Sequence, residues 1–200
     1  MGQRDRRLEV AEAAWRVIVR DGLDRTSLRA IAQEMNCTTG VVTHYFRNKQ
    51  ALILFALHQV TERLQGMMAA AIAHQSGSAR LVAMLCSFLP MDQERQEILK
   101  VWVAFLGYAV GRPALMASHQ HSAGLLRQML IQEVVNLQQD GTIRADVDSG
   151  QVVNVLLALV NGLGLDSLIQ AQPLSPDQQQ DAVQSYINGL KNGLKAADSR

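Results

Sequence analysis

Apolar residues recur along this chain every three to four positions, the period that places side chains on one face of an α-helix. No stretch alternates apolar and polar residues in the manner of a half-buried β-strand. The four prolines, at positions 90, 113, 173 and 176, fall where one helical pattern ends and another begins. The pattern therefore predicts an all-α protein of about nine helices.

Short polar residues mark where these helices start. Thr26 or Ser27 suits the N-cap of the second helix, Thr38 that of a short third one, Asn48 that of a long fourth one, and Asp148 that of the eighth. The remaining helices are expected at about 4–21, 27–35, 48–74, 79–89, 92–110, 114–139, 148–171 and 176–197, with the third directly after Thr38.

The second and third helices are separated by only a few residues, which favours a helix-turn-helix. We therefore expect residues 1–50 to form a three-helix helix-turn-helix DNA-binding domain. Residues 51–200 would form a regulatory ligand-binding and dimerisation domain, and the helix at 48–74 would link the two. "HQSGSA" at 74–79 is the best linker within the chain.

The third helix has two different faces at about 100° per residue. One face carries short hydroxyls, a glycine and a histidine, and the other carries the apolar side chains Val41, Val42 and Phe46 together with Tyr45. Short side chains let a helix lie deep in the major groove, where Thr and His can meet bases or phosphates. An ordinary solvated face is the alternative, but it usually carries Glu, Lys and Gln, and this one has no acid.

Charge is distributed unevenly although the formal net charge is only +1. Residues 1–65 hold ten Lys and Arg against seven acids, and residues 66–200 hold nine against eleven. The basic excess favours a polyanion partner at the front of the chain.

Two isolated cysteines, Cys37 and Cys86, indicate neither a disulfide framework nor a zinc site. No signal peptide is visible, and the apolar run at 152–165 is interrupted by Asn and Gly, so we expect a cytoplasmic protein without membrane contact.

The segment "TSLRAIAQEMNCTTGVVTHYFRNKQALI" (26–53) resembles the DNA-binding domain of the TetR family of bacterial transcriptional regulators. Its "GVVTHYF" is closest to the BetI-like branch. The resemblance implies an operator-binding dimer with a variable C-terminal sensor domain. It places Thr38, Thr39, Gly40, Thr43 and His44 on the DNA face and Tyr45 and Lys49 on phosphates. Thr26 and Arg29, which belong to the same motif and its basic flank, complete the expected DNA-binding set.

A small-molecule effector is expected in the C-terminal helices, although its identity does not follow from the sequence. If the likeness to the BetI branch extends to the ligand, aromatic rings could hold a quaternary ammonium by cation–π attraction. Aromatics at helical spacing are more often plain core, and that reading stays open. The candidate ligand-binding residues are Phe88, Trp102, Phe105, Tyr108, Met116, His119, Asn161 and Asp166.

Two apolar helices near the end, 148–171 and 176–197, make a plausible homodimer surface, although they could merely close the monomer's own core. No catalytic motif, cofactor motif or metal site is recognisable, so an enzyme is not expected. The sequence thus favours a ligand-responsive repressor that binds a near-palindromic double-stranded DNA operator as a dimer. The alternatives are a DNA-binding activator without a ligand, or an all-α small-molecule-binding protein.

Overall fold

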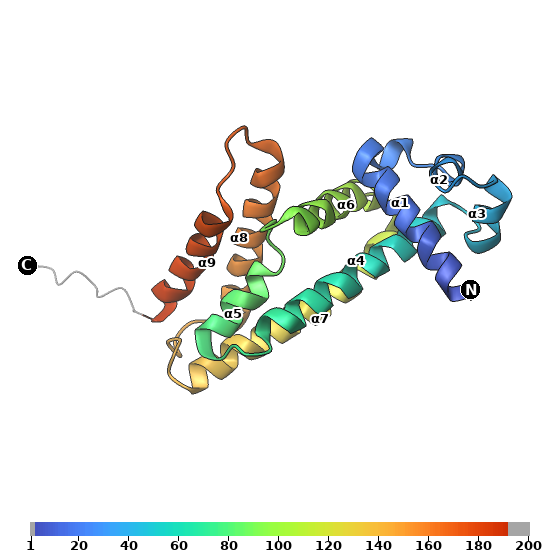
Figure 1. Ribbon diagram of the computed structural model, residues 1–200. Coiled ribbons are helices and arrows are strands. Elements are labelled where there is room, and N and C mark those ends of the chain that lie inside the picture. The colour runs from blue at the N-terminus through green and yellow to red at the C-terminus, as the bar shows by residue number, and fades with distance from the viewer. Residues whose placement is uncertain (1–2, 192–200) are drawn as a thin grey trace, which may run out of the picture. The chain divides into compact units, whose positions relative to one another are not determined.

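The computed structural model describes residues 3–191, with side chains from residue 6 onward, and this part of the chain contains nine α-helices and no strand (Figure 1). The all-α prediction is thereby confirmed. The helices are α1 (Gln3–Arg25), α2 (Leu28–Glu34), α3 (Thr39–Tyr45), α4 (Lys49–Ile72), α5 (Gly77–Cys86), α6 (Gln93–Ala109), α7 (Pro113–Gln139), α8 (Ser149–Ile169) and α9 (Pro176–Lys191).

Three of the predicted caps hold their helices by hydrogen bonds to backbone amides. Ser27, rather than Thr26, caps α2 by accepting from the amide of Ala30. Asn48 accepts from the amide of Ala51 over 2.8 Å at the start of α4, and Asp148 accepts from that of Gln151 over 2.7 Å at the start of α8. Thr38 occupies the N-cap of α3 with an extended backbone but makes no capping bond through its side chain. The predicted continuation of α9 beyond 191 lies outside the described residues.

The predicted end of the first helix at Asp21-Gly22 corresponds to a break inside α1. Gly22 has φ 78° and ψ 166°, a backbone conformation that residues with a Cβ rarely adopt. The helical bounds continue to Arg25 on the far side of this break.

The chain divides into two compact units, and each is described by itself. The first unit consists of Met1–Arg63 and Glu97–Ser118, and the second of Leu64–Gln96 and His119–Arg200. The first unit thus adds the beginning of α4, most of α6 and the beginning of α7 to the three N-terminal helices. The functional boundary predicted at residue 50 stays a prediction, because compactness groups the helices in another way.

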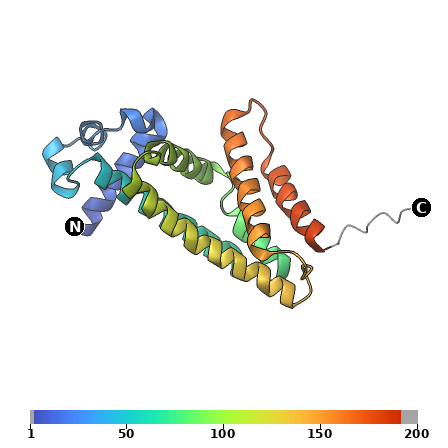
Figure 2. The same cartoon turned by 180° about the vertical axis from the view of Figure 1, so that it is seen from behind.

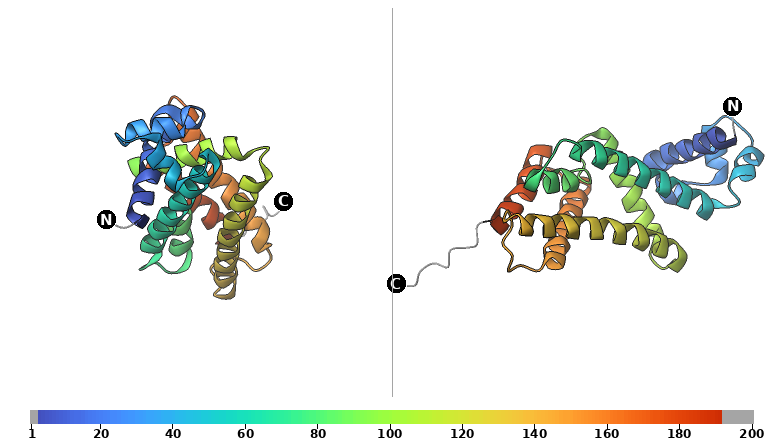
Figure 3. Two further views of the ribbon diagram at one scale, coloured as in Figure 1. Left: turned by 90° about the vertical axis from the view of Figure 1, so that its right-hand side faces the viewer. Right: turned by 90° about the horizontal axis from the view of Figure 1, so that it is seen from below.

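In the first unit, α1, α2 and α3 lie together (blue in Figure 3). Their core is closed by apolar side chains of α4. The fully buried members are Val10, Ala13, Ala14, Val17, Ile31, Ala32, Val42, Phe46 and Leu52. Each N-terminal helix therefore contributes at least one anchor to a common core.

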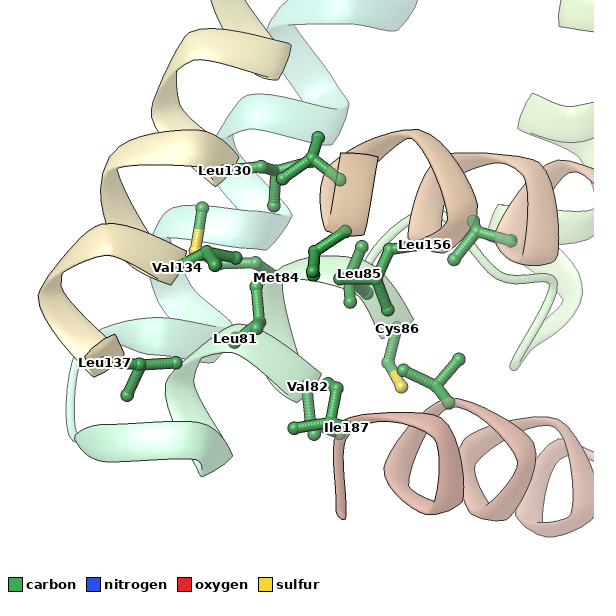
Figure 4. Packing of buried hydrophobic residues seen from close by; sticks show 14 of the residues in the cluster. Leu81, Val82, Met84, Leu85, Cys86, Leu130, Val134, Leu137, Leu156 and Ile187 are labelled. Atoms are coloured by element: carbon green, nitrogen blue, oxygen red, sulfur yellow. The ribbon is translucent and has the colours of Figure 1, made fainter. Parts of the chain in front are cut away.

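The core of the second unit is centred on α5 (Figure 4). Leu81, Met84 and Leu85 of α5 are at most 2% exposed, and side chains of α7, α8 and α9 surround them. The close-up shows Leu130 and Val134 from α7, Leu156 from α8 and Ile187 from α9 directed toward them.

Helices α8 and α9 run side by side in opposite directions (Figures 1 and 2). Within the described residues, α8 is the helix that is long and apolar enough to cross a membrane by length and composition, with a mean hydropathy of 1.9. Core helices of soluble proteins meet the same criteria. Val153, Leu156 and Val160 of α8 are indeed buried in the core of the second unit.

Candidate DNA-binding site

A tight turn separates α2 from α3. Asn36 adopts the left-handed conformation with φ 51°, which Asn tolerates better than most residues. The amide of Cys37 then donates to the carbonyl of Ala32 over 2.9 Å, and this bond closes the C-terminal end of α2. The predicted break at Asn36-Cys37 is confirmed, and it gives the helix-turn-helix its short connection.

α3 is amphipathic, as the sequence predicts. Val42 and Phe46 are at most 1% exposed and anchor the helix in the core of the first unit. Phe46 follows the last helical residue, Tyr45, so the helix ends slightly earlier than expected. The outward side consists of Thr39, Gly40, Thr43 and His44, all exposed.

The polar side chains of this face are free of acidic neighbours in the printed contacts. The hydroxyl of Thr43 donates to the carbonyl of Gly40 over 3.1 Å and keeps its lone pairs as acceptors. The His44 ring meets the edge of Tyr45 with centroids 4.9 Å apart. Tyr45 is half-buried, which fits a ring that packs while its hydroxyl can reach outward. A short donor and acceptor surface of this kind can meet base edges.

Thr26 and Arg29 differ in their access to solvent. Thr26 is only 2% exposed, and its hydroxyl donates to the carbonyl of Gly22 over 2.8 Å. This bond favours a structural role for Thr26, holding the segment that follows the break in α1. Arg29 lies exposed on α2, and Thr38 lies exposed at the start of α3, so both remain available to a partner.

Lys49, expected on a phosphate, is half-buried at the first position of α4. Its ammonium donates to the carbonyl of Leu23 over 2.6 Å. Burial lowers the pKa of Lys49, while the charge of Asp24 raises it and that of Arg112 lowers it further. The sequence gave no signal for this anchorage, because its acceptor is a backbone atom distant in the chain.

A cluster of charged side chains ties α1 to α2. Glu34 of α2 accepts hydrogen bonds from Arg16 over 2.8 Å and from Arg20 over 2.7 Å. These guanidinium groups lower the pKa of the Glu34 carboxyl, and Arg20 likewise lowers that of Asp21. The cluster orients α2, and sequence reasoning missed it because its members are scattered over two helices.

Arg7 of α1 lies over two aromatic rings of the first unit. Its Cζ is 5.1 Å from the ring centroid of Phe46 and 4.6 Å from that of Phe55. An arginine over an aromatic face is attracted by its quadrupole. Beside it runs an open groove of about 730 Å³ that includes two α3 residues and is lined by Arg7, Leu8, His44, Tyr45, Phe55, His58, Gln59 and Glu62.

The candidate ligand residues are divided between the two units. Trp102, Phe105, Tyr108 and Met116 belong to the first unit, and Phe88, His119, Asn161 and Asp166 belong to the second. Phe105 is buried, whereas Asn161 and Asp166 are exposed on α8. Burial lowers the pKa of the half-buried His119. Their joint role in ligand binding therefore stays a prediction.

Two protein families match different parts of the chain. Residues 10–55 match the family described as bacterial regulatory proteins, tetR family. Residues 77–191 match the family described as BetI-type transcriptional repressor, C-terminal. The first match covers the helix-turn-helix, and the second covers more than half of the chain.

Relatives of full length and solved structures agree with these matches. The HTH-type transcriptional regulator PksA of Bacillus subtilis is 26% identical over 92% of this chain and 89% of its own length. The HTH-type transcriptional regulator BetI of Burkholderia mallei is 27% identical over 95% and 96%.

Among solved structures, a transcriptional regulator from Pseudomonas aeruginosa PAO1 is 29% identical, with a TM-score of 0.81 over 96% of this chain and 93% of that one. A regulator from Saccharomonospora viridis, solved in complex with choline, has a TM-score of 0.86 at 22% identity over 92% and 96%. This second likeness concerns the fold.

Proposed function

The chain belongs to the TetR family of bacterial regulators, with a C-terminal domain of the BetI type, and from this premise we propose that it is an effector-released homodimeric repressor. Members of this family bind DNA and usually act as dimers. The observation that carries the proposal is the face of α3 that has no acidic residue, with Thr39, Thr43 and His44 exposed above the buried Val42.

We propose that this face enters the major groove. Thr39, Thr43 and His44 would meet base edges, and Gly40 would allow the helix backbone to come close. A Cβ on Gly40 would meet only the Thr38 hydroxyl at 3.6 Å, so the protein's own packing does not require glycine there. Arg29, Thr38, Tyr45 and Lys49 would hold phosphates on either side and set the register of the helix.

The dimer would form along α8. Its exposed small and apolar residues follow each other at intervals of three and four, the spacing of a helix–helix seam. Leu165 is 40% exposed and Ile169 is 70% exposed, which is unusual for large apolar side chains of a helix. A Cβ on Gly162 would meet no atom of the chain, so this glycine leaves room for a second helix. The seam consists of Val155, Ala158, Gly162, Leu165 and Ile169.

A second protein surface suits this seam better than a lipid phase. Only 28% of the apolar window of α8 is buried, yet Asn154, Asn161 and Asp166 are exposed around it. Polar side chains in hydrocarbon are costly, whereas a dimer seam tolerates them at its rim. Asn154 also accepts a hydrogen bond from Arg127 of α7.

Selection of duplexes from a random library tests the DNA-binding part of this proposal. A two-fold dimer places its two recognition helices about one DNA turn apart, roughly 34–36 Å. The protein should therefore enrich a near-palindrome whose half-sites are separated by about 10 base pairs or a multiple of that distance. Enrichment of a single unrepeated site would contradict the dimeric arrangement.

The effector would act by a shift of populations. It must bind more tightly to the shape that does not fit two half-sites, since equal affinity for both shapes shifts nothing. α4 contributes Lys49–Arg63 to the first unit and its remainder to the second, so it is the proposed link between effector and DNA.

Quaternary ammonium compounds are the first effectors to test, because a regulator of the same fold was solved with choline. A bound effector should raise the thermal unfolding midpoint of the protein and release it from its selected duplex. If choline and betaine-like compounds do neither, the quaternary ammonium proposal fails while the DNA-binding proposal stands.

A further inference from the structure

Lys49 and Tyr108, far apart in the sequence, meet within the first unit. The Lys49 ammonium lies 5.6 Å from the centroid of the Tyr108 ring, while it donates to the carbonyl of Leu23. Tyr108 also carries the guanidinium of Arg112, whose Cζ is 3.9 Å from the ring centroid. Arg112 in addition donates to the backbone carbonyl of Tyr108. One aromatic ring thus serves two cations of the chain.

This contact joins three segments with different duties. Lys49 is the first residue of α4 and follows the recognition helix closely. Leu23 follows the break in α1 and precedes the cap of α2. Tyr108 stands one position before the end of α6, the helix that also carries Trp102 and Phe105. A residue of a candidate sensor helix therefore contacts a candidate phosphate-binding residue.

We propose that Tyr108 is a positioning residue for DNA binding: it holds the Lys49 ammonium where a phosphate of the duplex receives it. The inference rests on the phosphate contact proposed above for Lys49. It also assigns Tyr108 a task other than enclosing an effector, since its ring is already occupied by cations of the chain itself.

The geometry leaves Lys49 able to bind while it is held. An ammonium has three N–H donors, and the carbonyl of Leu23 takes one of them. A free lysine side chain loses much rotamer freedom when a phosphate fixes it. Lys49 has already lost part of that freedom and part of its hydration, as the lowering of its pKa by burial indicates. Holding it in place therefore reduces what DNA binding costs.

The arrangement also gives α6 a route to the DNA. A displacement of the end of α6 would withdraw the Tyr108 ring from Lys49 and weaken one phosphate contact. An effector that contacts Trp102 or Phe105 on the same helix would thus lower DNA affinity without touching the recognition helix.

A double-mutant cycle on the full chain tests the inference. The affinity for the duplex selected by the wild-type protein is measured for Tyr108→Leu, Lys49→Met and the double variant. We expect Tyr108→Leu to weaken binding about two- to fivefold, the usual size of an exposed cation–π contact. In the Lys49→Met background the same substitution should change nothing. An unchanged or tighter affinity of Tyr108→Leu would overturn the inference, as would equal weakening in both backgrounds.

Two further readouts separate positioning from a merely structural role. Tyr108→Phe keeps the ring and should bind like the wild-type protein, whereas a role of the hydroxyl would make it resemble Tyr108→Leu. Loss of one phosphate contact should also reduce the slope of log affinity against log salt by about 0.9 in Tyr108→Leu. An unaltered slope together with weaker binding would contradict the inference.

The contact itself is observable without DNA, which separates this inference from the DNA-binding proposal. Lysines carrying ¹³C-labelled dimethyl groups keep their charge, and the Lys49 signal is assigned by its loss in Lys49→Met. Tyr108→Leu should shift this signal in the free protein, and an unshifted signal refutes the contact. A wild-type protein without salt-sensitive DNA binding would refute the DNA-binding proposal, whereas binding that ignores Tyr108→Leu refutes only the positioning role.

Discussion

The exposed and anchored side chains of the head have different tasks, and the difference is measurable one residue at a time. Thr43 and His44 project from the outer face of α3, so replacing either with alanine should remove base contacts. We expect a loss of about 1–3 kcal/mol in the preference for the selected duplex over a random one. Competition binding with both duplexes measures it, and Arg47→Ala serves as an exposed control of α3's flank. A uniform weakening on both duplexes would show that these residues do not read sequence.

Lys49 should behave in the opposite way, because a phosphate contact carries no sequence information. Lys49→Ala is expected to weaken the selected and the random duplex alike and to lower the salt slope by about one. The same competition assay records both quantities. A change confined to sequence preference would rule out the phosphate assignment.

Residue-level placement was only partly predictable from the sequence. The exposure of Thr39, Thr43 and His44 follows from helical periodicity, which needs no knowledge of other elements. The bonds of Thr26 to Gly22 and of Lys49 to Leu23 are not predictable in this way, because each ends on a backbone carbonyl. Nothing in the sequence pattern marks which carbonyl remains unpaired.

At the scale of the element, α3 depends on two apolar anchors for its orientation. Phe46 is 1% exposed and packs at a tilt against Phe55, with ring centroids 5.4 Å apart. Phe46→Ala should lower the free energy of unfolding by about 3–5 kcal/mol, the cost of a large core truncation. Denaturant unfolding measures this loss. Exposed Arg47→Ala should change stability by no more than about 0.5 kcal/mol, and an equal loss in both variants would contradict the anchoring role.

The brace between α1 and α2 should make stability depend on pH through Glu34. Arg16 and Arg20 lower the pKa of its carboxyl in the folded protein. A group with a lowered folded pKa contributes stability above its unfolded value, about 4.3, and loses it as the pH falls through the folded value. Glu34→Gln should therefore lower the thermal midpoint at neutral pH and approach the wild-type midpoint in acid.

Thermal unfolding of both proteins at several pH values checks this expectation. Glu62→Gln is the matched control, because Glu62 forms an exposed pair with His58 within one helix. Such pairs contribute little, so that variant should follow the wild-type protein at each pH. A midpoint difference for Glu34→Gln that does not depend on pH would mean that its charge is not the cause.

Element boundaries were predictable where a polar side chain caps a helix. Ser27, Asn48 and Asp148 bond to amides three residues ahead, a purely local geometry. The tertiary surroundings of α6 were not predictable. Three-residue spacing puts Trp102, Phe105 and Tyr108 on one side of a helix, but it does not reveal that Lys49 and Arg112 share the ring of Tyr108.

At the scale of the whole molecule, the account depends on a second copy of the chain. Leu165 lies in the proposed α8 seam, and a charge there would be buried on dimerisation at high cost. Leu165→Glu should shift the protein to monomers without unfolding it, which sedimentation at several concentrations and circular dichroism measure together. Leu125→Glu on α7 is the matched control, since Leu125 is 52% exposed and outside the seam. Dissociation by both variants, or by neither, would remove the support for this seam.

The most direct test of the central claim is a titration of the selected duplex with the protein, followed by fluorescence anisotropy between about 50 and 200 mM salt. The account predicts saturation at two chains per duplex for a minimal pair of half-sites. It also predicts an affinity that falls steeply as salt rises, because the basic residues of two heads displace counterions. Saturation at one chain per duplex, or binding that is indifferent to salt, would contradict it.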